Sequence, residues 1–122
     1  LNRKVSAGEI RRVLQRVGLD PDLKKPVAKY SLGMRQRLGI AQAIMEDPDF
    51  LILDEPFNGL DKRGVVDIRS ILLDLKRRGK TILLASHNSG DINLLCDEVY
   101  EIDAGILRPM TGETRQEKER MT

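Results

Sequence analysis

A run of four apolar residues followed by two carboxylates, from Phe50 to Pro56, constrains the fold of this chain more than any other stretch. Four apolar residues without alternation predict a strand buried on both faces, as in a parallel sheet covered by helices. Pro56 ends the strand, because proline cannot donate a hydrogen bond to a sheet ladder. Asp54 and Glu55 are therefore expected at the carboxyl edge of a sheet, where α/β proteins bind their ligands.

Two adjacent carboxylates suit a site for magnesium and a nucleotide, because one can bind the metal while the other acts on a water molecule. Mg²⁺ prefers oxygen ligands and keeps part of its water, so Asp54 can hold it beside substrate phosphates. Glu55 can then orient or deprotonate an attacking water. The structural alternative is a solvated acidic turn after a buried strand, and this stretch alone leaves both interpretations open.

A second strand is predicted at Thr81–Ala85, after a helix that starts at Lys62 and ends before Gly79. The two strands and the intervening helix predict a right-handed βαβ unit. His87 follows the second strand as Asp54 and Glu55 follow the first. We therefore expect the imidazole at the same carboxyl edge of the sheet, beside the two carboxylates.

Ser31 is predicted to cap a helix that ends before Asp47 and Pro48. A serine hydroxyl, a glycine at position 33 and the free N–H groups of a helix N-terminus together suit a phosphate. An ordinary capped amphipathic helix is the alternative. An earlier helix is predicted to start at the capping box of Ser6 and Glu9 and to stop at Gly18.

The rest of the chain carries structural signals. Ser89 is predicted to cap a short helix, Glu98–Asp103 alternates as a strand, Ile106–Leu107 reads as a short return strand, and residues 109–122 form a polar tail.

The 122 residues carry 21 Lys and Arg against 19 Asp and Glu, a net charge of +2. This balance, with two Tyr and two Phe and no basic-aromatic stripe, argues against a nucleic-acid-binding module.

Gly79-Lys80-Thr81 matches the end of the phosphate-binding P-loop pattern G-x-x-x-x-G-K-[ST]. The first glycine of that pattern falls on Asp74, however. A P-loop also leaves a strand and opens a helix, whereas this triplet leaves a helix and opens a strand. The sequence therefore predicts a helix stop here and contains no P-loop.

From about Tyr30 to Leu107 the chain resembles the C-terminal half of an ATP-binding-cassette (ABC) ATPase. Ser31 to Arg37, SLGMRQR, is similar to the family signature LSGGQxQR, and Phe50 to Glu55 is similar to its Walker B strand. Asn58 to Asp61 resembles the D-loop, and Ser86-His87 the switch histidine. Leu32 stands in place of the first signature glycine and Met34 in place of the glutamine, a variant similar to the ATP-binding subunits of bacterial drug and antibiotic exporters.

The resemblance implies a role for each matching residue. Asp54 would support Mg²⁺, Glu55 would polarise the hydrolytic water, and His87 would hydrogen-bond the γ-phosphate of ATP. Across a head-to-tail dimer, the ATP held by the opposite subunit would be contacted by the signature residues Ser31, Gly33 and Met34. Asp61 would couple the two subunits.

The resemblance also implies a partial P-loop NTPase-like α/β fold, a parallel sheet flanked by helices. Residues 1–47 would form part of the helical subdomain, residues 48–108 the C-terminal half of the ATPase core, and residues 109–122 the tail. Since the chain starts at Leu1 and lacks a P-loop, we expect an internal piece of a longer polypeptide that neither binds ATP tightly nor hydrolyses it alone. An unpaired strand edge would favour self-association of the piece.

The implied function is the motor subunit of a transporter, cytoplasmic and attached to the inner face of the membrane through separate permease subunits. A soluble ABC ATPase of translation or DNA repair is the alternative. The repair type usually carries a long coiled coil before the signature, and no heptad run is present here. Two cassettes in one chain would mark the translation type.

Overall fold

The computed structural model describes residues 4–111 and residue 120, and its contacts divide the chain into two units, Leu1–Ala85 and Ser86–Thr122. The predicted domain limits at residues 47 and 108 stay predictions. The first unit contains the helices α1 (Ala7–Arg16), η1 (Val27–Lys29), α2 (Leu32–Ile44) and α3 (Lys62–Arg77), and the strands β1 (Phe50–Asp54) and β2 (Thr81–Ala85). The second unit contains α4 (Ser89–Leu95), β3 (Val99–Asp103) and β4 (Ile106–Met110).

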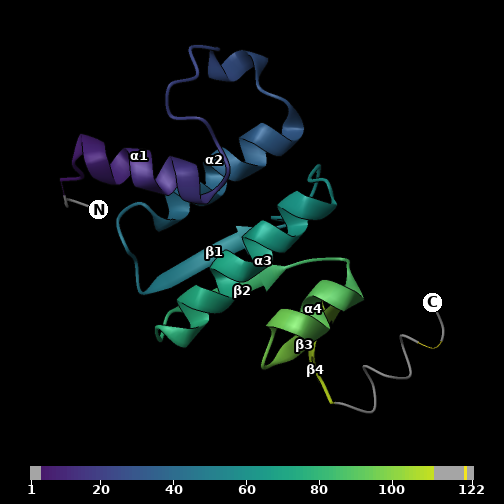
Figure 1. Ribbon diagram of the computed structural model, residues 1–122. Helices are drawn as coiled ribbons and strands as arrows, with labels where there is room; N and C mark the ends of the chain where they lie inside the picture. The colour runs from purple at the N-terminus through teal and green to yellow at the C-terminus, as the bar shows by residue number, and fades with distance from the viewer. Residues whose placement is uncertain (1–3, 112–119, 121–122) are drawn as a thin grey trace. The chain divides into compact units, whose positions relative to one another are not determined.

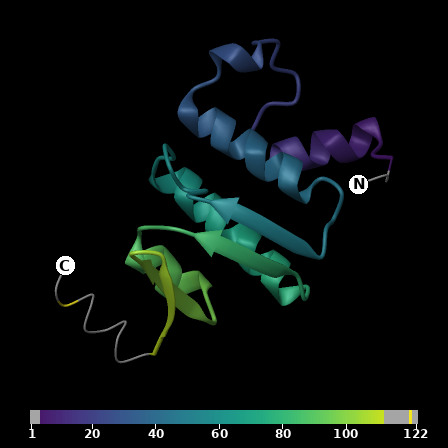
Figure 2. The ribbon, with the colours of Figure 1, turned by 180° about the vertical axis from the view of Figure 1, so that it is seen from behind.

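The strands β1 and β2 pair in parallel, and α3 makes the connection between them, as predicted. Ile52 lies opposite Leu83, and Asp54 lies opposite Ala85. In the view from behind, the two strands lie side by side in front of α3 (Figure 2). The carboxyl ends of both strands therefore reach the same edge of the sheet.

The core of the first unit is formed by one face of α2, one face of α3, one face of β1 and the chain that directly follows α1. α1 and α2 lie next to each other, and α3 runs along the paired strands (Figure 1). Their buried apolar residues follow helical spacing on the helices and alternate along β1. They are Val17, Leu19, Ile40, Ala41, Ile44, Leu51, Leu53, Ile68, Ile71, Leu72 and Leu75.

The prediction that the apolar strands are buried on both faces is wrong for the described chain. Leu51 and Leu53 are buried, but Ile52 is 68% exposed and Leu83 on β2 is 57% exposed. The helices of this unit cover one face of the sheet, so every second side chain of β1 points away from them. An apolar run without alternation therefore does not guarantee a second covering layer within the same chain.

The helix starts follow the predicted caps with one correction. Ser6 accepts a hydrogen bond from the Glu9 N–H, and Ser31 accepts one from the Met34 N–H. For α4 the N-cap is Asn88 rather than Ser89, because the Asn88 side chain accepts from the Asp91 N–H at 3.0 Å. Ser89 is the first helical residue.

The second unit contains the predicted hairpin, with β3 and β4 antiparallel. The return strand is longer than predicted, because it continues through Met110, and Tyr100 lies opposite Pro109. Of the predicted tail, residues 112–119, 121 and 122 lie outside the described residues. No helix among residues 4–111 and 120 is both long and apolar enough to cross a membrane.

Candidate nucleotide site

The candidate site of the first unit starts at the end of β1. Asp54 is the last strand residue and is exposed, and Glu55 is half-buried in the turn that follows. Glu55 adopts φ 46°, in the left-handed region that non-glycine residues seldom occupy, at a cost of about 1–3 kcal/mol. Such a conformation persists only where neighbouring groups hold it.

Hydrogen bonds hold the backbone of Glu55 on both sides. Its N–H donates to the Ala85 carbonyl at 2.8 Å, which ties the turn to the end of β2. Its carbonyl accepts from the side-chain amide of Gln36 at 2.8 Å and from the Asn58 N–H at 3.1 Å. Gln36 lies on α2, so two different elements, β2 and α2, fix the backbone from which the Glu55 carboxylate projects.

The start of α2 lies against the turn that follows Glu55. A Cβ atom on Gly33 would lie 2.9 Å from the Gly59 carbonyl oxygen, and one on Gly59, at φ 77°, would lie 2.6 Å from Cγ of Leu32. Both glycines therefore permit a close backbone approach within the chain. The sequence pattern predicts that Gly33, which has no side chain, leaves room for a phosphate. In the structure it leaves room for the Gly59 carbonyl of the same chain.

Ser31 is exposed, so its hydroxyl is not part of the core. The oxygen accepts from the Met34 N–H at 3.1 Å, which leaves the hydroxyl hydrogen available as a donor. Leu32 is 58% exposed, and Met34 is half-buried. The beginning of this 13-residue helix thus presents a capped N-terminus at the surface of the unit.

Arg37, three residues inside α2 from Met34, connects α2 to two other elements. One guanidinium nitrogen donates to the Val17 carbonyl at 2.8 Å, and the other lies 3.9 Å from Oδ1 of Asp61. Asp61 is the N-cap of α3 and accepts from the Gly64 N–H at 2.8 Å. Arg37 thereby links the end of α1, α2 itself and the start of α3.

Asp54, Glu55, Asp61 and residues 31–37 all lie in the first unit, where Gln36 contacts Glu55 and Arg37 contacts Asp61. His87 is exposed and belongs to the second unit, which begins directly after β2, so its placement beside Glu55 stays a prediction. Sequence reasoning did not assign roles to Gln36 and Arg37. Gln36 and Arg37 lie in the signature-like stretch, which marks them as candidate functional residues. The spacing of that stretch does not indicate which groups their long side chains contact.

Within the described residues no group of three or more His, Cys, Asp and Glu side chains could hold a metal ion alone. A single exposed carboxylate at a strand end still fits Mg²⁺, which proteins often bind through one or two carboxylates plus substrate phosphates and water. The donor set around Asp54 therefore suits a metal that arrives with a nucleotide.

Lys80 serves a structural contact rather than a phosphate. Its ammonium group lies 3.2 Å from Oδ1 of Asp47 and 3.3 Å from Oδ1 of Asp49. These hydrogen bonds, the one to Asp47 first, raise the pKa of Lys80 above its ordinary value. Gly79 has φ 84° directly after the C-cap of α3, which confirms the predicted helix stop.

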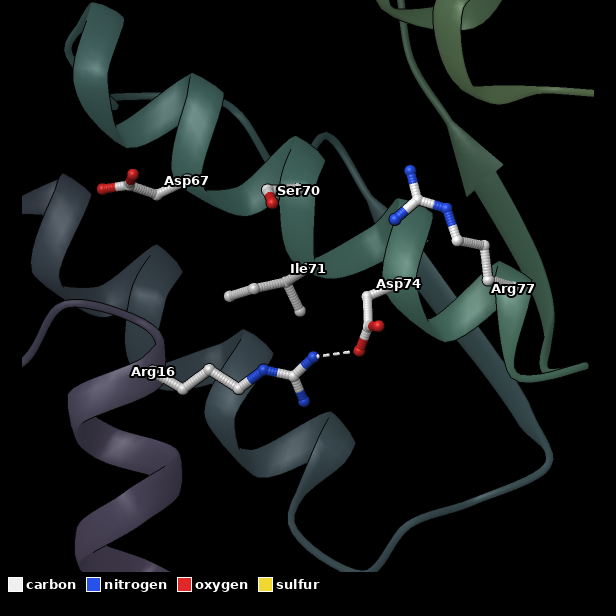
Figure 3. Close-up of a pocket in the computed structure, with 6 residues that line it drawn as sticks. All are labelled: Arg16, Asp67, Ser70, Ile71, Asp74 and Arg77. Atoms are coloured by element: carbon white, nitrogen blue, oxygen red, sulfur yellow. Dashed lines mark hydrogen bonds and ion pairs between the residues drawn. The ribbon is translucent and has the colours of Figure 1, made fainter.

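A hollow of about 410 Å³ in the first unit lies apart from the candidate site residues. Its lining comes from the end of α1 and from α3, and Arg16 donates to Asp74 at 2.6 Å across it (Figure 3). Asp67 and Ser70 lie on the same side of α3. None of the predicted site residues lines this hollow.

Comparison with known proteins agrees with the motifs. The family model described as "ABC transporter" matches residues 2–58. The ABC transporter ATP-binding protein YybJ of Bacillus subtilis is 47% identical over 107 residues, 88% of this chain and 49% of that protein. The bacitracin transport ATP-binding protein BcrA of Enterococcus faecalis is 45% identical over 104 residues, 84% of this chain and 34% of that protein.

The lantibiotic transport ATP-binding protein SrtF of Streptococcus pyogenes is 45% identical over 101 residues, 83% of this chain and 44% of that protein. The chain thus spans half or less of the length of these three relatives. All three carry "ATP-binding protein" in their names.

Proposed function

Because this chain belongs to the ABC transporter family of ATP-binding proteins, we propose that it forms the C-terminal half of a nucleotide-binding domain that hydrolyses ATP to drive transport. The observation that carries the proposal is the turn after β1, where Asp54 ends the strand and Glu55 is held in a left-handed conformation. Strained backbone of this kind clusters at functional sites. The missing half would supply the P-loop.

In the proposed reaction, Mg²⁺ bound with ATP would supply positive charge that offsets the negative charge of the phosphate oxygens. Asp54 would hold the metal, directly or through water. Glu55 orients the attacking water and accepts its proton, and His87 donates a hydrogen bond to an oxygen of the terminal phosphate. The start of α2, through Ser31 and the free N–H groups beside it, binds the phosphate of ATP held by a second copy.

We further propose a head-to-tail dimer attached to separate membrane permease subunits, with export of an antibiotic as the transported step. The names of BcrA and SrtF, which state bacitracin and lantibiotic transport, support this choice over a soluble ABC ATPase of translation or DNA repair. Co-purification with a membrane-spanning subunit supports the transporter. An ATPase that purifies with ribosomes or DNA instead contradicts it.

ATP hydrolysis by the full-length subunit that carries these residues tests the role of Glu55. Glu55→Gln keeps the size of the side chain but removes the base, so kcat is expected to fall about 10²- to 10⁴-fold. Asp67→Asn makes the same type of change on α3, on the wall of the hollow in Figure 3, and is expected to keep kcat within about twofold of wild type. Equal activity of Glu55→Gln and wild type overturns the assignment.

A further inference from the structure

The carboxylate proposed as the base projects from a backbone that two elements hold in a strained conformation. The Ala85 carbonyl fixes the N–H of Glu55, and the side-chain amide of Gln36 fixes its carbonyl, each at 2.8 Å. The first contact is between neighbouring strand ends and involves backbone only. The second depends on one side chain, which substitution can remove.

We propose that Gln36 is a positioning residue for ATP hydrolysis, which aims the Glu55 carboxylate by holding the Glu55 carbonyl. The inference rests on the proposed function, because the reaction of Glu55 comes from there. Without the Gln36 donor, the carbonyl still accepts from the Asn58 N–H within the turn, at 3.1 Å, but no longer from the side chain of α2. The Glu55 carbonyl then loses its hydrogen bond to α2, and the carboxylate samples positions away from the water.

The same helix carries the proposed phosphate contact and the tie to Glu55. Ser31 caps α2 at its first turn, and Gln36 lies about one turn further along. A hydrogen bond of 2.8 Å is lost when its atoms separate beyond about 3.5 Å, so a displacement of α2 by about 1 Å away from β1 breaks the hydrogen bond from Gln36 to the Glu55 carbonyl. Through Gln36, the orientation of the Glu55 carboxylate depends on the position of α2.

Steady-state ATP hydrolysis by the full-length subunit, with kcat and KM for ATP determined separately, tests this inference. Gln36→Glu keeps the shape but replaces the donor by an acceptor, and Gln36→Leu removes the donor without adding charge. Both variants are expected to lower kcat about 10- to 100-fold with KM for ATP changed less than threefold, because a misplaced base impairs chemistry more than binding.

Gln42→Glu makes the same chemical change at an exposed position further along α2 and is expected to keep wild-type kcat. In a Glu55→Gln background, Gln36→Glu is expected to cause no further loss, because both changes act through one carboxylate. Wild-type kcat in Gln36→Leu, an additive loss in the double variant, or a rise in KM alone overturns the inference. Wild-type activity of Glu55→Gln overturns the proposed function instead, which separates the two failures.

Discussion

Two glycines make room for the guanidinium group of Arg37. A Cβ atom on Gly18 would collide with one of its terminal nitrogens, and a Cβ atom on Gly64 would lie 2.6 Å from the other and 3.0 Å from Oδ1 of Asp61. The Arg37 side chain is 17% exposed. Alanine at position 64 therefore requires Arg37 to move, and a moved Arg37 loses the Val17 carbonyl or the contact with Asp61.

Gly64→Ala is expected to destabilise the chain by about 1–3 kcal/mol, the usual cost of inserting a methyl group into a packed site. Urea unfolding measures this free energy. Gly39→Ala provides the matched control, since Gly39 also lies inside a helix but a Cβ there meets nothing within 4 Å. That control is expected to stabilise by about 0.5–1 kcal/mol, so equal effects of the two substitutions would contradict the role of Gly64.

At the scale of single residues, the sequence predicts what a position can do better than what it touches. Ser31, Asp54 and Glu55 could be placed at a helix start and a strand end because local pattern decides those positions. The contacts of Gln36 and Arg37 could not be predicted, because tertiary packing decides where long side chains end. The strained backbone of Glu55 was missed for the same reason, since it depends on β2 and α2.

Helix α2 depends on its N-cap for stability and, in the proposed function, for binding phosphate. Ser31→Ala is expected to cost about 1 kcal/mol of unfolding free energy, because the Met34 N–H loses its acceptor. Ser31→Asp keeps an acceptor and is expected to retain most of the stability while lowering ATP turnover of the full-length subunit, because a carboxylate repels phosphate. Full activity of the Asp variant would contradict the phosphate role, and unchanged stability of the Ala variant would contradict the cap.

Helix α1 is tied to the connector that follows it by Arg11, whose guanidinium donates to both carboxylate oxygens of Asp22, at 2.8 and 3.1 Å. That hydrogen bond lowers the pKa of Asp22 below its ordinary value. The pair therefore stabilises the fold above the ordinary carboxyl pKa, and the contribution is lost as the pH falls through the lowered pKa.

Arg11→Gln is accordingly expected to lower the urea midpoint slightly at pH 7 and to leave it equal to wild type once Asp22 is protonated in both states. Arg12→Gln, the neighbouring position on the same helix, controls for lost charge and helix propensity. A deficit of Arg11→Gln that persists unchanged at the acid limit would show that the ion pair is not its cause.

The bounds of helices with clear capping residues could be predicted closely. The burial of the strands could not, because it depends on how many layers of helices cover the sheet. Capping residues and glycines placed α1, α2 and α3 within a residue or two, and the two short strand patterns at Glu98–Asp103 and Ile106–Leu107 placed the hairpin. The N-cap of α4 was assigned one residue late because Asn88 and Ser89 are both good caps. Burial of β1 and β2 was overestimated because an apolar run does not reveal how many layers cover it.

For the molecule as a whole, the exposed face of the β1–β2 sheet is the feature with the largest consequence. Phe50, Ile52 and Leu83 are 54%, 68% and 57% exposed, and the two strands form a sheet of their own. Apolar surface next to unpaired strand edges favours association. We therefore expect the 122-residue chain to self-associate at micromolar concentration.

Ile52→Lys combined with Leu83→Lys places two charges on this face and is expected to reduce the associated fraction in light scattering. Val66→Lys is the control, because Val66 is 60% exposed on α3 rather than on the sheet. A monodisperse wild-type monomer, or an equal effect of the Val66 substitution, would contradict association through this face.

ATP hydrolysis measured side by side on the 122-residue chain and on the full-length subunit tests the central claim most directly, that these residues hold one half of an ATPase site. The account predicts no turnover by the chain alone, and magnesium-dependent turnover by the full-length subunit that Glu55→Gln abolishes. Turnover by the chain alone that disappears in Glu55→Gln, or a full-length subunit indifferent to that substitution, would contradict it.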